Sequence, residues 1–159
     1  MPVAYVALGS NLGDKEQNIR GAIERMEQHG IQVLQVSPLF TTEPYGVTDQ
    51  PVFLNGAAAV EWAGDAESLL HPLLVIEQER GRQRKRHWGE RNIDLDLLLF
   101  GDQVIHSADL ELPHPDMANR SFVLEPLAAI AGTAVHPVFH RTIGELWADL
   151  QEKQQKKGD

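Results

Sequence analysis

Two aspartates separated by one residue offer the clearest chemistry in the sequence. Asp94 and Asp96 lie in residues 93–100, where polar and apolar residues alternate before an apolar run, the pattern of a β-strand. Side chains two positions apart on a strand point to the same face, so the carboxylates lie side by side. Such a pair needs a neutralising partner, and Mg²⁺ suits it, because this ion binds one or two carboxylates together with phosphate oxygens. Two ordinary solvated acids are the alternative interpretation.

A strongly basic segment directly precedes the aspartates. Residues 80–91 hold six of the chain's 14 lysines and arginines and one acidic residue, so they carry +5 while the rest carries −14. Metal ions and arginines can share the charge of phosphate oxygens, and neither familiar glycine-rich phosphate motif is present. The segment and the aspartates together predict a Mg²⁺-dependent enzyme acting on a nucleotide-like polyphosphate. A solvated basic loop paired with the acidic remainder is the alternative.

The composition excludes several other classes. The chain has 159 residues, 42% of them hydrophobic, which fits a single domain over residues 1–159. Its net charge of −9 disfavours nucleic acid and anionic membranes as partners, and the absence of cysteine excludes disulfides, Cys-ligated zinc and thiol catalysis. No signal-peptide pattern and no apolar run of about 18 residues occur. We therefore expect a cytoplasmic monomer.

Strands and helices alternate irregularly along the chain. Apolar, β-prone runs predict strands, over 3–8, 31–40, 52–62 and 93–100. Apolar residues at helical spacing predict helices, over 14–28, 66–80, 123–130 and 142–150. This order favours an α+β fold with at least one antiparallel strand pair over a doubly wound parallel sheet.

The connecting segments carry further expectations. Pro72 conflicts with its predicted helix, so we expect an irregularity there. We interpret 9–11 (GSN) as a structural turn, with contact to the site as the alternative, and 101–115 as a turn and loop. Residues 151–159 are polar, and we expect a frayed C-terminal tail.

Several segments together resemble one enzyme family. Residues 87–98 (HWGERNIDLDLL) resemble the signature of the 6-hydroxymethyl-7,8-dihydropterin pyrophosphokinases of folate biosynthesis. Residues 4–12, 53–55 and 113–122 match further segments in the family's order. The resemblance implies a ferredoxin-like α+β fold, an antiparallel sheet with helices layered on both sides. It also implies transfer of pyrophosphate from ATP to the pterin's hydroxymethyl group, with release of AMP.

The resemblance assigns the phosphate chemistry to particular residues. It implies ATP as co-substrate and two Mg²⁺ ions held by Asp94 and Asp96, which with Arg82 and Arg91 form the catalytic set. The residues that match the family's ATP-binding positions are Glu77, Arg84, Trp88, His114 and Arg120. Arg82, Arg84, Trp88 and Arg91 belong to a loop that closes over the phosphates in the family.

The resemblance also implies a pterin site. Phe53 and Phe122 match the positions that stack on the flat ring, although core packing is their alternative role. Asn55 matches a polar contact to the ring edge, and a strand asparagine is unusual because a buried amide needs hydrogen-bond partners. The remaining substrate contacts match Thr42, Pro44 and Tyr45.

Two other function classes compete with this interpretation. A different metal-dependent phosphate enzyme, such as a phosphohydrolase or nuclease, is disfavoured by the aromatic and amide residues suited to a flat ring. A non-catalytic module is disfavoured by the intact aspartate pair and loop arginines. Some nucleotide-contacting positions depart from the family's pattern: Leu74, Asp109, Glu111, Pro115 and Ala118.

Overall fold

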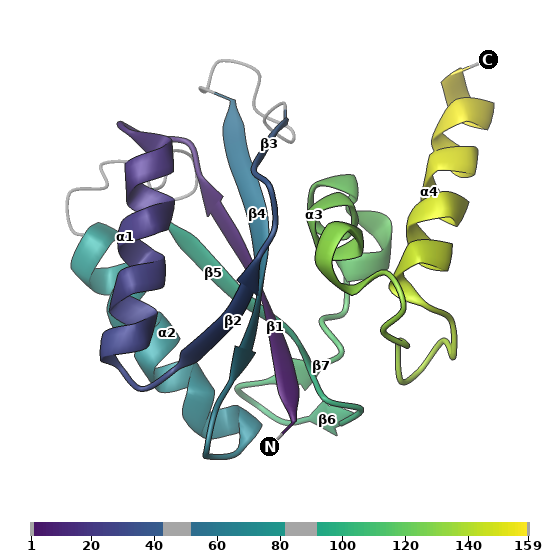
Figure 1. The fold of residues 1–159 in the computed structure, drawn as a ribbon. Helices are drawn as coiled ribbons and strands as arrows, with labels where there is room; N and C mark the ends of the chain where they lie inside the picture. The colour runs from purple at the N-terminus through teal and green to yellow at the C-terminus, as the bar shows by residue number, and fades with distance from the viewer. Residues whose placement is uncertain (1, 43–51, 82–91, 159) are drawn as a thin grey trace.

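The centre of the molecule is an antiparallel sheet (Figure 1). The computed structural model describes residues 2–42, 52–81 and 92–158. The strands of the sheet run in the order β2-β4-β1-β5, with β3 also pairing with β4. Their bounds are β1 (Val3–Ser10), β2 (Gln32–Val36), β3 (Phe40–Thr42), β4 (Phe53–Glu61) and β5 (Asp94–Phe100). This order confirms the expected ferredoxin-like topology, because each of two interleaved β-α-β units places its strands on either side of a strand of the other.

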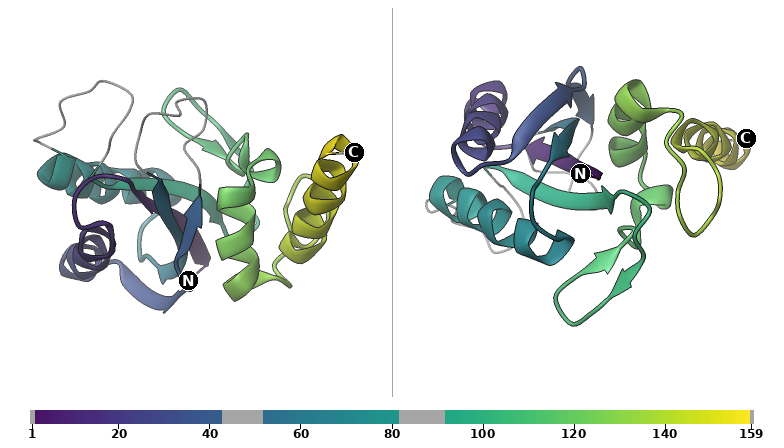
Figure 2. Two further views of the ribbon diagram at one scale, coloured as in Figure 1. Left: turned by 90° about the horizontal axis from the view of Figure 1, so that it is seen from above. Right: turned by 60° about the horizontal axis from the view of Figure 1, so that its bottom comes forward.

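Helices cover both faces of the sheet, as expected (Figure 2). One face packs against α1 (Lys15–Gln28) and α2 (Ala66–Gly81), which contribute residues such as Met26 and Leu69 to the larger core. The other face packs against α3 (Ser121–Ala131), and α4 (Ile143–Gly158) lies outside α3. The sheet therefore separates two apolar cores.

Strand periodicity divides β1 between these cores. Ala4, Val6 and Leu8 are buried in the core beneath α1 and α2, whereas Tyr5 and Ala7 pack against the core beneath α3. A strand that is covered on both faces is apolar throughout, which explains the unbroken run at the start of the sequence. The strand continues through Gly9 to Ser10, so the turn expected at residues 9–11 begins later than predicted.

Helix α2 begins with a capped first turn. The Ser68 N–H donates to Asp65 Oδ1 at 2.8 Å, and this hydrogen bond holds the pKa of the Asp65 carboxyl below its ordinary value. The helix then continues without interruption across Pro72, where we expected an irregularity. Pro72 is itself buried, and the packing of Leu69 and Leu73 in the core offsets the loss of one backbone hydrogen bond.

The structure corrects two further expectations. The loop expected over 101–115 contains a short hairpin of β6 (Ile105–His106) and β7 (Glu111–Leu112). Strands of two residues are too short to show a periodic pattern in the sequence. The tail expected to fray is the second half of α4, since glutamine, glutamate and lysine have high intrinsic helix propensity. Among the described helices, none has both the length and the apolarity that crossing a membrane requires.

Candidate active site

The aspartate pair lies at the start of β5, an edge strand of the sheet. Leu95 and Leu97 point into the core beneath α1 and α2, so Asp94 and Asp96 point to the opposite face, as the alternation predicts. Asp94 is half-buried and Asp96 is exposed. Two aspartates whose Cα atoms lie about 7 Å apart along the strand therefore share one face.

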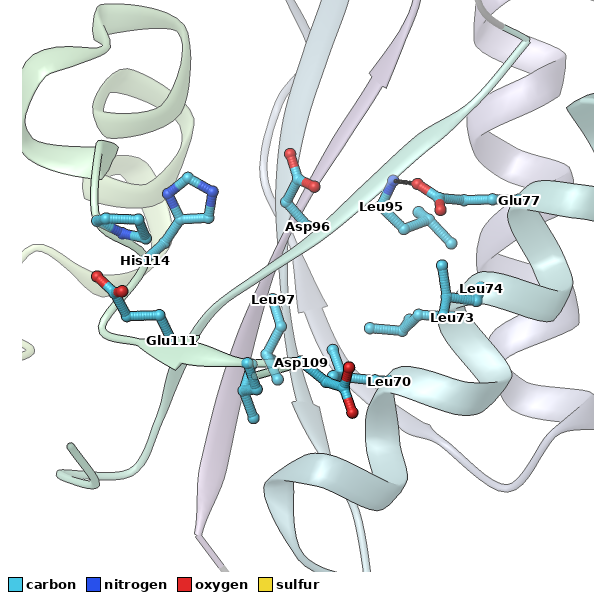
Figure 3. A pocket seen from close by; sticks show the side chains of 12 residues that line it. Leu70, Leu73, Leu74, Glu77, Leu95, Asp96, Leu97, Asp109, Glu111 and His114 are labelled. Carbon is cyan, nitrogen blue, oxygen red and sulfur yellow. Dashed lines mark hydrogen bonds between the residues drawn. The ribbon is translucent and has the colours of Figure 1, made fainter. Parts of the chain in front are cut away.

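Glu77 ties α2 to this part of β5. The Leu95 N–H donates to Glu77 Oε2 at 2.8 Å, drawn as a dashed line in Figure 3. Leu95 lies between the two aspartates, so this hydrogen bond satisfies a backbone donor of the edge strand at the pair itself. Glu77, which matches an ATP-binding position of the family, thus also holds the strand that carries the carboxylates.

A pocket of about 330 Å³ opens beside Glu77 and Asp96 (Figure 3). Leucines of α2 and β5 supply its apolar wall, and the β6–β7 hairpin with the segment that follows it supplies a polar wall. The lining residues are Leu70, Leu73, Leu74, Glu77, Leu95, Asp96, Leu97, Asp109, Leu110, Glu111, His114 and Pro115. An apolar surface with a few polar groups is typical of a site for a small organic ligand. Leu74, Asp109, Glu111 and Pro115, which depart from the family's pattern, all line it.

Acidic side chains dominate the polar part of this pocket. Glu77, Asp96, Asp109 and Glu111 contribute four carboxylates, and His114 is the one imidazole among the lining residues. The Asp116 N–H donates to His114 Nδ1 at 3.3 Å, so in the neutral ring the proton lies on Nε2, which can donate to a ligand. The pocket therefore suits a ligand that brings its own hydrogen-bond donors, with its phosphates directed elsewhere.

Two of the expected pterin residues, Phe53 and Asn55, lie on the same face of the sheet as the aspartates. In the register, Asn55 of β4 pairs with Gly9 of β1, and Gly9 pairs with Asp94 of β5. Directly paired residues of antiparallel strands point to the same face, so this row places Asn55 and Asp94 about 10 Å apart. Asn55 is buried, with 6% of its surface exposed, and Phe53 lies two residues earlier on the same face.

Phe122 approaches this face from the first turn of α3. Its ring packs against the core beneath α3, and the Arg120 guanidinium carbon lies 5.8 Å from the ring centroid. Arg120 also forms an ion pair with Asp116, whose carboxylate oxygen lies 3.4 Å from the guanidinium nitrogen. Because α3 packs against β3 and β4, Phe122 and Phe53 come from neighbouring elements.

The other expected residues lie at the edge of the described chain or beyond it. Thr42 ends β3 and pairs with Phe53 in the register. Six expected residues lie outside the described residues: Pro44, Tyr45, Arg82, Arg84, Trp88 and Arg91. The leucine wall was not predicted, since Leu70 and Leu73 fit the core face of a helix equally well. Gly9 was interpreted as a turn residue, although it lies in the row that joins Asn55 to Asp94.

Comparisons with known proteins identify the family. A family model described as 7,8-dihydro-6-hydroxymethylpterin-pyrophosphokinase (HPPK) matches residues 5–132. The 2-amino-4-hydroxy-6-hydroxymethyldihydropteridine pyrophosphokinase of Methylorubrum extorquens is 43% identical over 151 residues, 94% of each chain. The Pseudomonas aeruginosa protein of the same name is 44% identical over 128 residues, 80% of this chain and 79% of the relative.

Some relatives are much longer. Folic acid synthesis protein fol1 of Pneumocystis carinii is 45% identical over 134 residues, which are 84% of this chain and 18% of the relative. This chain therefore spans about a fifth of the length of such relatives. A crystal structure of Plasmodium falciparum HPPK-DHPS shares the fold with a TM-score of 0.78 at 14% identity, over 98% of this chain and 46% of that one. The family model and the relatives that match over most of their length show that the chain belongs to the 7,8-dihydro-6-hydroxymethylpterin-pyrophosphokinase family.

Proposed function

We propose that this chain transfers pyrophosphate from ATP to the hydroxymethyl oxygen of 6-hydroxymethyl-7,8-dihydropterin in folate biosynthesis, releasing AMP. One observation carries the proposal: a carboxylate pair and a buried amide beside an aromatic ring share one face of the sheet, two strands apart. Carboxylates suit a metal–phosphate complex, and the amide with Phe53 and Phe122 suits a flat heterocycle. A pyrophosphokinase for a pterin needs both at once.

The aspartate pair fits Mg²⁺, and we propose two ions. Asp94 and Asp96 offer hard oxygen ligands on one open face. Among the described residues, no three His, Asp or Glu side chains come together as a metal cage. That arrangement suits an ion that keeps water and takes phosphate oxygens from its substrate. When bound, Mg²⁺ supplies positive charge that neutralises the phosphate chain during transfer.

The reaction is a displacement at the β-phosphorus of ATP. The hydroxymethyl oxygen forms a bond to this phosphorus, and the bond to the oxygen that bridges the α- and β-phosphates breaks, so AMP leaves with that oxygen. The hydroxyl proton passes to the Asp96 carboxylate or to water. Positioning and charge stabilisation supply most of the catalysis in such a transfer, so the main task of the protein is to align the two substrates.

The nucleotide would bind with its nucleoside in the leucine-walled pocket and its phosphates toward the aspartates. Glu77, His114 and Arg120 line or flank that route, and the Nε2 proton of His114 is available to a phosphate oxygen. Arg82 and Arg91 would stabilise the transferring group, with Arg84 and Trp88 contributing to ATP binding. Placing the nucleoside in the pocket and the phosphates outside it agrees with the acidic pocket wall, because carboxylates accept hydrogen bonds from ribose hydroxyls but repel phosphates.

The pterin would lie between Phe53 and Phe122, with Asn55 and Thr42 at its polar edge and Pro44 and Tyr45 completing the site. The buried Asn55 amide supports this placement, since it can both donate to and accept from a pterin edge. We further propose that the protein works as a cytoplasmic monomer and binds neither nucleic acid nor membranes, in keeping with its acidic net charge of −9.

The direct test mixes the protein with ATP, MgCl₂ and 6-hydroxymethyl-7,8-dihydropterin and follows the nucleotides by chromatography. We expect AMP and the pterin diphosphate in equal amounts, no AMP without the pterin, and loss of activity with EDTA that excess Mg²⁺ restores. Pterin-independent formation of ADP or inorganic phosphate, with no AMP, would instead indicate the competing phosphohydrolase class.

A further inference from the structure

Gly9 occupies the centre of the candidate site. It lies on β1, the strand between β4 and β5, and pairs with Asn55 on one side and Asp94 on the other. A side chain at this position would point to the same face as both neighbours. The one residue of the row without a side chain is therefore the one between the amide and the carboxylate.

The backbone of β1 does not require a glycine here. Among the described glycines, the left-handed conformation occurs at Gly13, Gly30 and Gly101, and Gly9 lies instead within a regular strand. Glycine weakens a strand interior, because it loses more conformational freedom on folding and offers no side chain to pack. Its presence in a strand commonly marks a close approach of another group.

The close approach comes from the Asn55 side chain. A Cβ atom added to Gly9 would lie 3.1 Å from Asn55 Oδ1 and 3.9 Å from Phe53 Cδ1. The first contact is tight, and Asn55 is buried, so its amide has little free space into which it can move. An added methyl group would therefore displace or rotate the amide.

We propose that Gly9 is a positioning residue for the pterin: its missing side chain lets the Asn55 amide lie across β1, toward the aspartates. This inference rests on the proposed function. The row spans about 10 Å between Asn55 and Asp94, a distance that a two-ring heterocycle with a one-carbon arm can bridge. The amide would thus fix the ring edge so that the hydroxymethyl oxygen reaches the phosphate at the aspartates.

Gly9→Ala tests this role through substrate binding. The measurement is calorimetric titration of 6-hydroxymethyl-7,8-dihydropterin in the presence of Mg²⁺ and an ATP analogue with a methylene group between the α- and β-phosphates. We expect the Kd of the pterin to rise by about tenfold or more, as overpacking of a tight site predicts, and the Kd of the analogue to change less than about twofold. An unchanged pterin Kd, or an equal loss for both ligands, would overturn the inference.

Gly132→Ala is the matched control. A Cβ at Gly132 would also lie 3.1 Å from a neighbour, the Ala128 carbonyl oxygen, and Gly132 has an ordinary right-handed backbone at the end of α3. This variant places a Cβ at the same distance from an oxygen atom but away from the site, in a backbone conformation that alanine accepts. We expect it to leave the Kd of the pterin unchanged.

A double variant separates positioning from general damage. If Gly9 acts through Asn55, the alanine at position 9 should add less than about a twofold loss of pterin affinity in an Asn55→Ala background. The same background should recover melting temperature lost in Gly9→Ala, because it removes the crowded amide, and this holds even where the single variant is too unstable to titrate. Losses that multiply, with no recovery of stability, would contradict the inference. A wild-type protein that neither binds the pterin nor forms AMP would overturn the proposed function itself.

Discussion

The two faces of the central sheet differ in composition, although the same strands build both. On the face beneath α1 and α2, the inward residues of β1 and β5 are apolar and almost fully buried, among them Val6, Leu8 and Leu95. On the other face, apolar residues such as Ala57 and Leu99 occupy one end, where they join the core beneath α3. Asn55, Gly9 and the aspartates occupy the other end.

This difference separates the residues that stabilise the fold from those proposed to carry the chemistry. Burial of apolar surface supplies most of the favourable free energy of folding, and the fully covered face provides it without interruption. Charged groups are costly in such a core, so they lie where the second layer ends. Adjacent residues of one strand, such as Leu95 and Asp96, therefore lie in different environments, and under the proposed function substitutions should separate activity from stability.

The largest effect is expected on the open face, at Asp96. Asp96→Asn preserves the shape of the side chain but removes the charge of the proposed Mg²⁺ ligand, so we expect kcat to fall by at least about a hundredfold. The melting temperature should stay the same or rise slightly, because two like charges no longer lie together. Steady-state AMP formation and a thermal melt measure the two quantities.

Asp102→Asn is the matched control for this variant. Asp102 is an exposed acid in the turn that follows the same strand, so its substitution should leave both quantities unchanged. Retention of most of the activity by Asp96→Asn would contradict the metal-binding role and place the chemistry elsewhere.

The covered face should respond in the opposite way. Leu8 is 1% exposed and lies next to Gly9 in the chain, with its side chain on the other face. Leu8→Ala should lower the free energy of unfolding by about 2–5 kcal/mol, as large-to-small core substitutions do. The exposed Leu34→Ala should change it by less than about 0.5 kcal/mol. Urea denaturation measures both. Below the unfolding transition, the pterin and ATP affinities of Leu8→Ala should match those of the wild type. A selective loss of either affinity would contradict the separation of stability and ligand binding between the two faces.

The smallest effect is expected at Glu77, whose hydrogen bond with the Leu95 N–H joins α2 to the strand that carries the aspartates. Glutamine keeps an oxygen that can accept the Leu95 N–H, whereas alanine leaves that backbone donor without this partner. We expect kcat to fall less than about twofold in Glu77→Gln and several-fold in Glu77→Ala, since one hydrogen bond contributes about 1 kcal/mol. Gln78→Ala, at the neighbouring exposed position of α2, is the control. Equal losses in both Glu77 variants would show that the charge, and not the support of the strand, is what matters.

Local sequence patterns were sufficient for much of the architecture. Alternation in residues 93–100 predicted a strand with Asp94 and Asp96 on one face, and helical spacing predicted α1 and α2. These predictions succeed because strand and helix periodicity assign each side chain to a face without any distant partner. The hairpin of β6 and β7 was missed because two-residue strands carry no such signal, and its buried Leu110 and Leu112 acquire their role from the core they meet.

The sequence by itself determined the chemical inventory: paired carboxylates, a basic segment, two aromatic rings, a strand amide, and the segments that resemble one family. Only the tertiary structure decided that Asn55, Gly9 and Asp94 form one row, because the register joins strands that are distant along the chain. It also brought Leu70, Asp109 and His114 together around one pocket. The physical reason is that the residue types are read directly from the sequence, whereas the relative positions of residues in different elements depend on which apolar faces pack together.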